Sequence, residues 1–320
     1  MRRAYVFRLR PTARQHIALG QCLTSHRELY NAALQERRDA WRLRGASVSY
    51  GDQSAQLKEI RQVRPDVAVW SFSSQQATLR RLNRAFAGFY RRVKAGGTPG
   101  YPRFKAAHRF DSVEWPTDGD GCRWQPDSRR VYLQGIGHVK VTVHRRVEGR
   151  VKTIQVRRQG RRWMLVLSCD EVPTRPLEPT RAAVGVDVGI ASLATTSDGQ
   201  HVPNPRCGRV AAAKLSTAQL VLARKRRGSN NRRRARETLA ARHRKLANQR
   251  RNFHHQVARA LVARYGLLVV EDLRIRNMVR RPAPHPDPDE PGRAGSCLTG
   301  RRPRPACTKA SMTRAGLSSC

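Results

Sequence analysis

The 320-residue sequence predicts an α+β protein built from several domains. Three observations carry this prediction. Helical periodicity dominates residues 11–95, short turn-separated strands follow in residues 96–180, and two apolar strands that end in carboxylates lie within residues 181–281. A chain of this length can hold two or three domains. We therefore expect a helical lobe, a small antiparallel β-barrel, and an α/β core interrupted by a long basic helical insertion.

The N-terminal segment predicts one strand followed by a long helix. Residues 4–10 alternate apolar and polar side chains, and we assign residues 1–10 to the first strand of the β-barrel. Pro11 ends the strand, and Thr12 with Gln15 forms a capping-box signature for the helix. Spacings of four and seven then place a set of apolar side chains on one core-facing surface: Leu19, Leu23, Tyr30, Leu34 and Trp41.

A second helix carries the first group of candidate nucleic-acid-binding residues. Ser73 and Gln76 give it a cap signature. Its apolar residues step by three and four toward the core: Leu79, Leu82, Phe86, Phe89 and Val93. The other surface carries arginines that either track a phosphate backbone or are simply solvated: Arg80, Arg84 and Arg91. Because the turn at residues 45–52 is not short, a simple helix-turn-helix reader of the major groove is not favoured.

Glycines and prolines in residues 96–102 end the helical pattern and predict a domain boundary. Apolar runs separated by turns then predict strands at residues 131–133, 139–143, 151–156 and 163–167. Strands of this length and spacing are typical of a small antiparallel barrel or sandwich. Trp163 is expected to be part of its core.

Two strands that end in acids form the candidate catalytic site. Valines alternate around Asp187 in residues 184–188, and residues 193–196 can return as an antiparallel strand. A turn-forming aspartate is the structural alternative. A second apolar run, residues 266–270, ends at Glu271. Paired carboxylates at strand ends are the ligands that a two-metal Mg²⁺ nuclease uses, so we expect Asp187 and Glu271 to be catalytic and to bind the metal.

Between the acidic strands, residues 207–265 have strong helical character, which residues 228–231 interrupt. Residues 206–251 contain sixteen Lys or Arg and one acid, Glu237. This excess favours an insertion that faces nucleic acid, and a basic solvated coiled coil is the alternative. The candidate nucleic-acid-binding residues in it are Arg224, Lys225, Arg226, Arg227, Arg232, Arg233, Arg234, Arg250 and Arg251.

The charge of the whole chain also predicts a nucleic-acid partner. With 64 Lys plus Arg against 23 Asp plus Glu, the formal net charge is +41, which a polyanion would compensate. No apolar run approaches the roughly 18 residues of a membrane span, so we expect a cytoplasmic protein without membrane contact. We also expect no small-molecule substrate. The seven cysteines form no Cys-x-x-Cys pair, so zinc is not expected.

Taken together, these blocks resemble the TnpB family of transposon-encoded, RNA-guided DNA endonucleases, also called OrfB-type transposases. The resemblance spans residues 2–289 and rests on Val186-Asp187-Val188-Gly189, on Val270-Glu271-Asp272-Leu273 and on Arg276-Asn277-Met278-Val279. It implies an RNase H-like core of the RuvC type, with its first and fourth strands side by side, a β-barrel wedge and a helical lobe. It also implies Mg²⁺ as the cofactor, held by Asp187 and Glu271, and DNA and a guide RNA as partners.

The C-terminal part departs from the family pattern, in which a four-cysteine zinc ribbon and a third acid follow the glutamate strand. Asp287, Asp289 and Glu290 lie in a proline-rich segment that cannot form the helix expected to carry the third ligand. We expect residues 282–320 to be a disordered, frameshifted tail and the nuclease to be truncated and catalytically incomplete. Two alternatives remain open: a non-catalytic DNA- or RNA-binding remnant or regulator, and a basic ribosome-associated or nucleoid protein.

Overall fold

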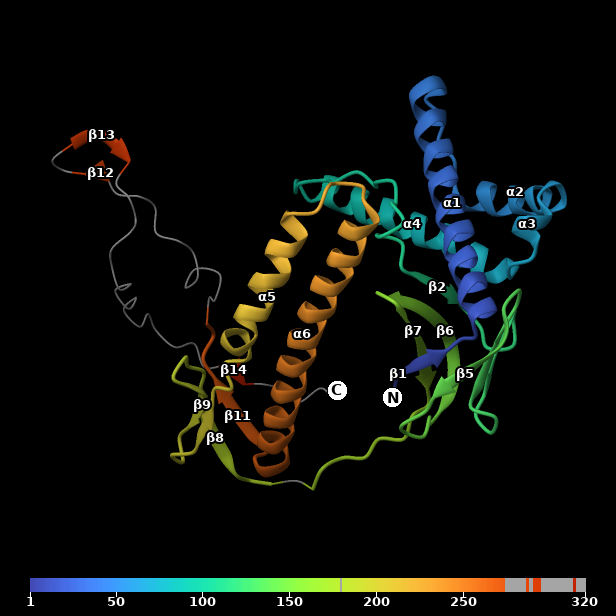
Figure 1. Ribbon diagram of the computed structural model, residues 1–320. Coiled ribbons are helices and arrows are strands. Elements are labelled where there is room, and N and C mark those ends of the chain that lie inside the picture. The colour runs from blue at the N-terminus through green and yellow to red at the C-terminus, as the bar shows by residue number, and fades with distance from the viewer. Residues whose placement is uncertain (179, 274–285, 288–289, 295–312, 315–320) are drawn as a thin grey trace. The chain divides into compact units, whose positions relative to one another are not determined.

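The computed structural model describes residues 1–178, 180–273, 286–287, 290–294 and 313–314. The chain forms two compact units, Met1–Arg175 and Pro176–Cys320. Each unit contains helices and a β-sheet, which confirms the predicted α+β class (Figure 1). Within the described ranges, none of the helices combines the length and the apolar character that crossing a bilayer needs.

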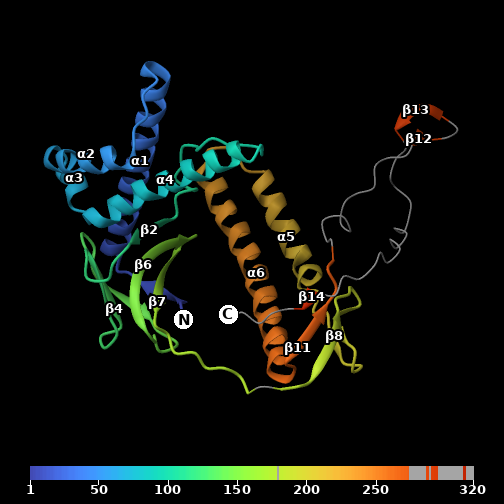
Figure 2. The ribbon, with the colours of Figure 1, turned by 180° about the vertical axis from the view of Figure 1, so that it is seen from behind.

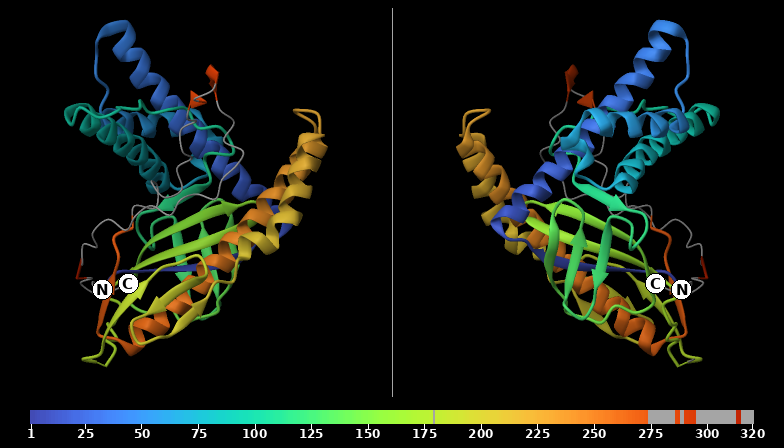
Figure 3. Two further views of the ribbon diagram at one scale, coloured as in Figure 1. Left: turned by 90° about the vertical axis from the view of Figure 1, so that its left-hand side faces the viewer. Right: turned by 90° about the vertical axis from the view of Figure 1, so that its right-hand side faces the viewer.

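A curled, seven-stranded antiparallel sheet forms the base of the first unit (Figure 3). Its strands are β1 (Arg3–Arg10), β2 (Ser112–Trp115), β3 (Cys122–Gln125), β4 (Arg130–Leu133), β5 (Gly137–Thr142), β6 (Arg150–Gln159) and β7 (Arg162–Asp170). Their order is β2-β6-β7-β1-β5-β4-β3, so β1 lies in the middle and pairs with both β7 and β5. Strands β2 and β3 are the two edges. The predicted barrel is therefore an open half-barrel in the part of the chain that the structure describes.

Four helices belong to the same unit: α1 (Ala13–Arg44), α2 (Tyr50–Val63), α3 (Pro65–Ala68) and α4 (Phe72–Lys94). The predicted capping box of α1 is confirmed, because Thr12 and Gln15 exchange both hydrogen bonds. The segment between the two predicted helices contains α2, which has its own capping box from Ser49 and Asp52. The predicted cap of α4 is wrong by two residues, since Ser71 accepts the hydrogen bond from the Ser74 backbone.

The helices and the sheet share one hydrophobic core. Leu19 of α1 and Leu82 of α4 belong to the same buried cluster as Phe7 and Leu165 of the sheet. Trp163, predicted to be core, is 2% exposed and donates a hydrogen bond to Nδ1 of His16 at 3.0 Å. The boundary predicted at residues 96–102 thus separates helices from strands along the chain, but it does not separate two cores.

Two residues predicted to face the core are exposed. Trp41 is 68% exposed and Val93 is 50% exposed. Both lie in the last turns of their helices, α1 and α4, beyond the surface that the rest of the unit covers. Helical periodicity identifies the apolar face of a helix. It does not show how much of the length of that face is covered by other parts of the protein.

The second unit contains a mixed sheet and a helical hairpin, which comes between β10 and β11 in the order of the chain (Figure 2). Its elements are β8 (Ala183–Asp187), β9 (Ser192–Thr196), β10 (His201–Pro203), α5 (Cys207–Ala223), α6 (Asn230–Arg264) and β11 (Leu267–Val270). Strands β8, β9 and β10 form an antiparallel meander, and β11 returns beside β8 and parallel to it. The predicted return strand after Asp187 and the predicted break in the helical insertion are both confirmed.

Three further short strands are described in the C-terminal region. They are β12 (Pro286–Asp287), β13 (Glu290–Ala294) and β14 (Thr313–Arg314). Strand β12 pairs with β13, and β14 pairs with β11. The remainder of the predicted frameshifted tail, residues 282–320, lies outside the described residues, and so does the whole family block at residues 276–279.

Candidate metal centre and nucleic-acid interface

Strands β8 and β11 bring the two candidate catalytic acids to the same edge of the second sheet. The two strands are parallel, in a register that runs from Leu267↔Ala183 to Val270↔Val186. Asp187 is the last residue of β8, and Glu271 directly follows β11. Continued by one residue, the register sets Glu271 opposite Asp187, on strands about 4.8 Å apart. The expected adjacency of the two acidic strands is therefore confirmed.

Alternation along β8 explains why Asp187 is available at the surface. Val184 and Val186 are 2% and 7% exposed and pack into the core, so the intervening positions point to the other face. Asp187 and Glu271 are both exposed. Among the described residues, neither carboxylate has a hydrogen-bond or ion-pair partner, because no such contact involves their side chains. Two adjacent, uncommitted carboxylates are thus free to bind a cation.

The chemistry of this pair fits Mg²⁺. Mg²⁺ takes oxygen ligands and is usually held by one or two carboxylates together with waters and substrate phosphates. Asp187 and Glu271 would supply the carboxylates. The described residues contain no group of three or more His, Cys, Asp or Glu side chains that could hold a metal ion. The described part of the site therefore amounts to two protein ligands.

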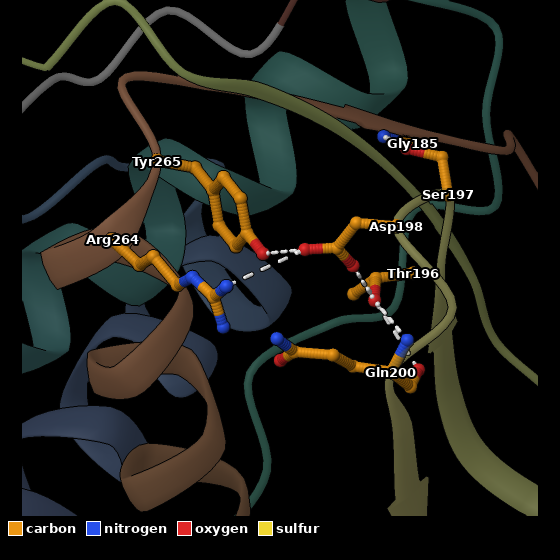
Figure 4. A network of polar contacts seen from close by, with 7 residues as sticks. All are labelled: Gly185, Thr196, Ser197, Asp198, Gln200, Arg264 and Tyr265. Carbon is orange, nitrogen blue, oxygen red and sulfur yellow. Dashed lines mark hydrogen bonds and ion pairs between the residues drawn. The ribbon is translucent and has the colours of Figure 1, made fainter.

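A third acid in the second unit, Asp198, has a structural role (Figure 4). It accepts hydrogen bonds from the hydroxyls of Thr196 and Tyr265, and Nη2 of Arg264 lies 3.8 Å from its carboxylate. These contacts, that from Thr196 first, lower the pKa of Asp198. The hydrogen bond to Asp198 also raises the pKa of Tyr265.

The Asp198 network ties the end of α6 to the turn between β9 and β10. The same turn is fixed to β8, because the Ser197 backbone donates to the Gly185 carbonyl at 2.8 Å and the Gly185 backbone donates to the Ser197 hydroxyl. Since β11 begins two residues after Tyr265, this network helps to set the register of β11 against β8. The turn is bonded to Gly185, in the middle of β8, whereas Asp187 is the last residue of that strand. The sequence pattern gave Asp198 no separate role.

The arginines of α4 divide into two groups. Arg81 donates to a backbone carbonyl and covers the ring of Phe110, and Arg92 donates to two carbonyls of the segment that follows the helix. The three arginines predicted to bind nucleic acid, Arg80, Arg84 and Arg91, are exposed, and their side chains make no such contact within the described chain. The predicted residues are therefore the ones left available for a partner.

The basic hairpin of α5 and α6 presents most of the other candidates, but not as one patch. Four consecutive exposed cations occupy the tip between the helices: Arg224, Lys225, Arg226 and Arg227. Exposed Arg233 and Arg234 follow at the start of α6, whereas Arg250 and Arg251, also exposed, lie about 24 Å further along the helix. The predicted cations thus follow the length of the hairpin, as an extended phosphate backbone would require.

Arg232 differs from the other predicted cations of the hairpin. One of its terminal nitrogens donates to the carbonyl of Leu222 at 2.9 Å and to that of Lys225 at 2.8 Å. It therefore caps the end of α5 and closes the hairpin. A direct phosphate contact would have to use its remaining nitrogen atoms.

The outer face of the half-barrel carries a row of cations that the sequence pattern did not single out. In the sheet register, Lys140 of β5 lies opposite Arg10 on one side and Arg130 on the other. Arg8 lies on the same strand, and the positive charge of Arg10 is the main cause that lowers the pKa of Arg8. Like charges directly opposite each other destabilise a sheet unless a counter-charge is present. Alternation placed these residues on the outer face, but the strand order was needed to align them.

Comparisons with known proteins identify the class of protein. The OrfB_IS605 family, described as "Probable transposase", matches residues 165–281, and its "Helix-turn-helix domain" matches residues 1–46. A "Putative RNA-guided DNA endonuclease" of Streptomyces pristinaespiralis is 32% identical over 302 residues, covering 88% of this chain and 69% of that protein. The "Putative RNA-guided DNA endonuclease InsQ" of Escherichia coli (strain K12) is 28% identical over 282 residues, covering 88% of this chain and 68% of that protein.

The chain belongs to this OrfB-type transposase family, as its sequence pattern indicated. A solved structure, a "Cas12f1-sgRNA-target DNA complex", is 14% identical with a TM-score of 0.47 and covers 81% of this chain. The chain spans 65% of that protein, and the similarity is too low to inform the site. Residues 1–46, matched as a helix-turn-helix domain, form β1 and the single helix α1.

Proposed function

We propose that this protein is a transposon-encoded, RNA-guided DNA endonuclease whose metal site includes Asp187 and Glu271. The parallel register of β8 and β11 carries the proposal, because it sets two uncommitted carboxylates side by side in a family whose relatives are named RNA-guided DNA endonucleases. The order β10-β9-β8-β11, with the first strand beside the fourth, supports an RNase H-like core of the RuvC type.

Each group of residues has a separate task in this proposal. Asp187 and Glu271 hold Mg²⁺, which when bound activates water and stabilises the leaving oxygen of a phosphodiester. The exposed arginines of α4 and of the α5–α6 hairpin bind the phosphates of DNA and of a guide RNA. Asp198 holds β11 in register and thereby positions Glu271.

A second candidate is a non-catalytic DNA- or RNA-binding regulator of the same family. It is favoured by the number of acids, since the described residues bring together two carboxylates and no group of three potential metal ligands. In that case the basic hairpin and α4 would bind nucleic acid as proposed, but hydrolysis would be weak or absent.

Cleavage with the co-purified RNA distinguishes the two candidates. The protein is purified from cells that carry its own gene region, the bound RNA is sequenced, and DNA complementary to that RNA is offered with Mg²⁺. We expect cutting that Asp187→Asn abolishes without loss of RNA binding, whereas Glu178→Gln, an exposed acid outside the site, leaves it unchanged. Defined RNA without cutting supports the regulator. The absence of RNA of defined sequence contradicts both and favours a general ribosome-associated or nucleoid protein.

The salt dependence of binding tests the proposed interface. Each phosphate contact contributes about −0.9 to the slope of log K against log salt for duplex DNA, so we expect a total slope steeper than about −3. Replacing Arg226 and Arg227 by Gln should reduce its magnitude by about 1 to 2. Arg92→Gln is the matched control, because its guanidinium is bound to the carbonyls of Pro99 and Gly100. An equal effect in the control would contradict the assignment of the hairpin tip.

A further inference from the structure

The first unit contains an aromatic cavity that none of the proposed nuclease or phosphate contacts uses. It has a volume of about 730 Å³ and lies between the end of α1, the start of α2 and the C-terminal half of α4. Ligand sites in proteins typically have volumes of about 300–1,000 Å³. Six aromatic side chains line the cavity: Trp41, Tyr50, Phe86, Phe89, Tyr90 and Tyr101.

Several of these rings are exposed although they are large and apolar. Trp41 is 68% exposed, Tyr90 is 54% exposed and Tyr101 is 44% exposed. Phe86 and Phe89 support Tyr101 through edge-to-face contacts, with ring centroids 5.5 and 5.3 Å apart. A gathering of exposed aromatic surface at a cavity is typical of a binding site.

Arg37 adds a buried positive charge to the lining. It is 8% exposed, its Nε donates to Oε1 of Gln53 at 2.9 Å, and its Nη1 donates to Oδ1 of Asn83 at 3.3 Å. Its other terminal nitrogen, Nη2, has no hydrogen-bond partner among the described residues. No described carboxylate forms an ion pair with Arg37, and its guanidinium lies 5.2 Å from the centre of the Phe86 ring.

The aromatic lining together with the unpaired Arg37 donor favours one kind of ligand for the cavity over others. The unpaired Nη2 donor of Arg37 is unfavourable next to a purely apolar partner, such as the face of an amphipathic peptide, because that partner offers no acceptor to a buried donor. A nucleotide supplies both complements. Its base has a face that stacks on aromatic rings, and its carbonyl and phosphate oxygens accept hydrogen bonds from guanidinium groups.

We propose that the cavity takes an unpaired nucleobase of a single-stranded nucleic acid, stacked against Trp41 and Tyr90, with oxygen atoms of the nucleotide toward Arg37. The cavity would hold one unstacked base while the exposed arginines hold the phosphate backbone. The inference rests on the nucleic-acid binding in the proposed function, and it is independent of cleavage.

Trp41 is a built-in reporter for this proposal. The chain has five tryptophans, and the other four, Trp70, Trp115, Trp124 and Trp163, are between 1% and 8% exposed. Quenching of tryptophan fluorescence by acrylamide therefore reads mainly Trp41. The full chain is titrated with single-stranded DNA, with single-stranded RNA, and with an abasic strand that has the same number of phosphates. Fluorescence anisotropy of the labelled strand measures binding independently.

We expect strands that carry bases to protect Trp41 from acrylamide, and the abasic strand to bind without protecting it. Trp41→Leu should weaken binding of the base-carrying strand by about 5- to 150-fold. Trp41→Phe, which keeps an aromatic ring, should retain most of the affinity. Leu43→Ala, on the same helix and 71% exposed but outside the cavity lining, is the matched control and should have no effect.

The outcomes separate this proposal from the proposed function. If base-carrying strands bind but leave Trp41 as accessible as in the free protein, or if Trp41→Leu binds as well as the wild type, the cavity assignment is wrong while the phosphate interface stands. If the abasic strand protects Trp41 equally, phosphate and not base occupies the cavity. If no strand binds, both proposals fail. The DNA and RNA arms show which strand supplies the base.

Discussion

In the first unit, helices and a seven-stranded sheet contribute to one continuous core, whereas the described core of the second unit is small. Its buried apolar side chains are Val184, Val186, Ala194 and Tyr265. Helix α6 has 35 residues, and of these only Ala235 and Leu246 are buried within the described chain. Burial of apolar surface is the dominant favourable term in folding, so the first unit is expected to be the more stable of the two.

The two units also differ in how their basic side chains are used. In the first unit several arginines are part of the internal structure: Arg61, for example, donates to the carbonyls of Trp70 and Ala68 and to Oε1 of Gln75. In the second unit, the cations at the hairpin tip are exposed and close together in sequence. The comparison teaches that one unit carries its own stability, while the other presents charge that a polyanionic partner would compensate.

Core substitutions should show the largest difference between the units. Leu165, in β7, is fully buried, and Leu165→Ala should lower the free energy of unfolding of the first unit by about 2–5 kcal/mol. Leu268, in β11, is only half-buried, and Leu268→Ala should cost the second unit about 1 kcal/mol.

Two optical probes separate these effects. All five tryptophans belong to the first unit, so denaturation followed by tryptophan fluorescence reports that unit alone. The helical circular dichroism signal also includes α5 and α6. Equal losses for the two substitutions, or a single transition seen by both probes, would contradict the contrast between a large and a small core.

Acid should weaken the first unit at a higher pH than the second. His26 is fully buried, with Nδ1 2.8 Å from the Cys22 carbonyl and Nε2 2.8 Å from the Ser74 hydroxyl. Burial lowers the pKa of His26 from 6.5 to about 4. Because the unfolded chain takes up this proton first, stability should fall as the pH drops from about 6.5 to about 4, by up to about 3 kcal/mol.

The second unit has a different pH window. Its Asp198 has a pKa below the ordinary value of 3.8, so the stability that this group contributes is present above that pH and is lost as the pH falls below it. Tryptophan-monitored unfolding between pH 7 and pH 4 should therefore show the His26 effect, and His26→Gln should remove this pH dependence. A His26→Gln protein that keeps the same slope would contradict the assignment.

Binding of nucleic acid should reduce the difference in stability between the two units. A ligand that binds only the folded state stabilises it by about 2.7 kcal/mol when present at a hundred times its Kd. We expect single-stranded nucleic acid to slow amide hydrogen exchange in α5 and α6 most strongly, because these helices have many exposed cations and few buried residues. Protection confined to the first unit would mean that the hairpin is a solvated coiled coil.

Much of the local structure could be predicted from the sequence because its causes are local. The alternation in β1, the capping box at Thr12 and Gln15, and the glycine-containing break between α5 and α6 each depend on a few neighbouring residues. The acids at Asp187 and Glu271 could be proposed as partners because both follow short apolar strands. Their register was fixed only by the pairing of β8 with β11, whose paired residues are 84 positions apart in a stretch that includes the whole helical hairpin.

Most of the features that sequence reasoning missed depend on contacts between distant parts of the chain, and α2 is the exception. Helix α2 was not predicted, and only its first residues fall in the turn predicted at residues 45–52, although Ser49 and Asp52 form a local capping box. The position of β1 beside β5 aligned Arg10 with Lys140, and no local pattern could show this. The cavity lined by Trp41 also escaped notice, because periodicity placed Trp41 in the core and only the packed structure shows it to be exposed.

Metal binding tests most directly whether the edge of the second sheet unites Asp187 and Glu271 in one site. Mn²⁺, a paramagnetic substitute for Mg²⁺, is titrated into the full chain and followed by electron paramagnetic resonance. Asp187→Asn and Glu271→Gln should each weaken binding about tenfold or more, and the double variant should lose much less than the sum of the two free-energy changes, because the ligands share one ion. Glu178→Gln should bind as the wild type does. Strictly additive losses, or wild-type affinity in either single variant, would contradict the shared site.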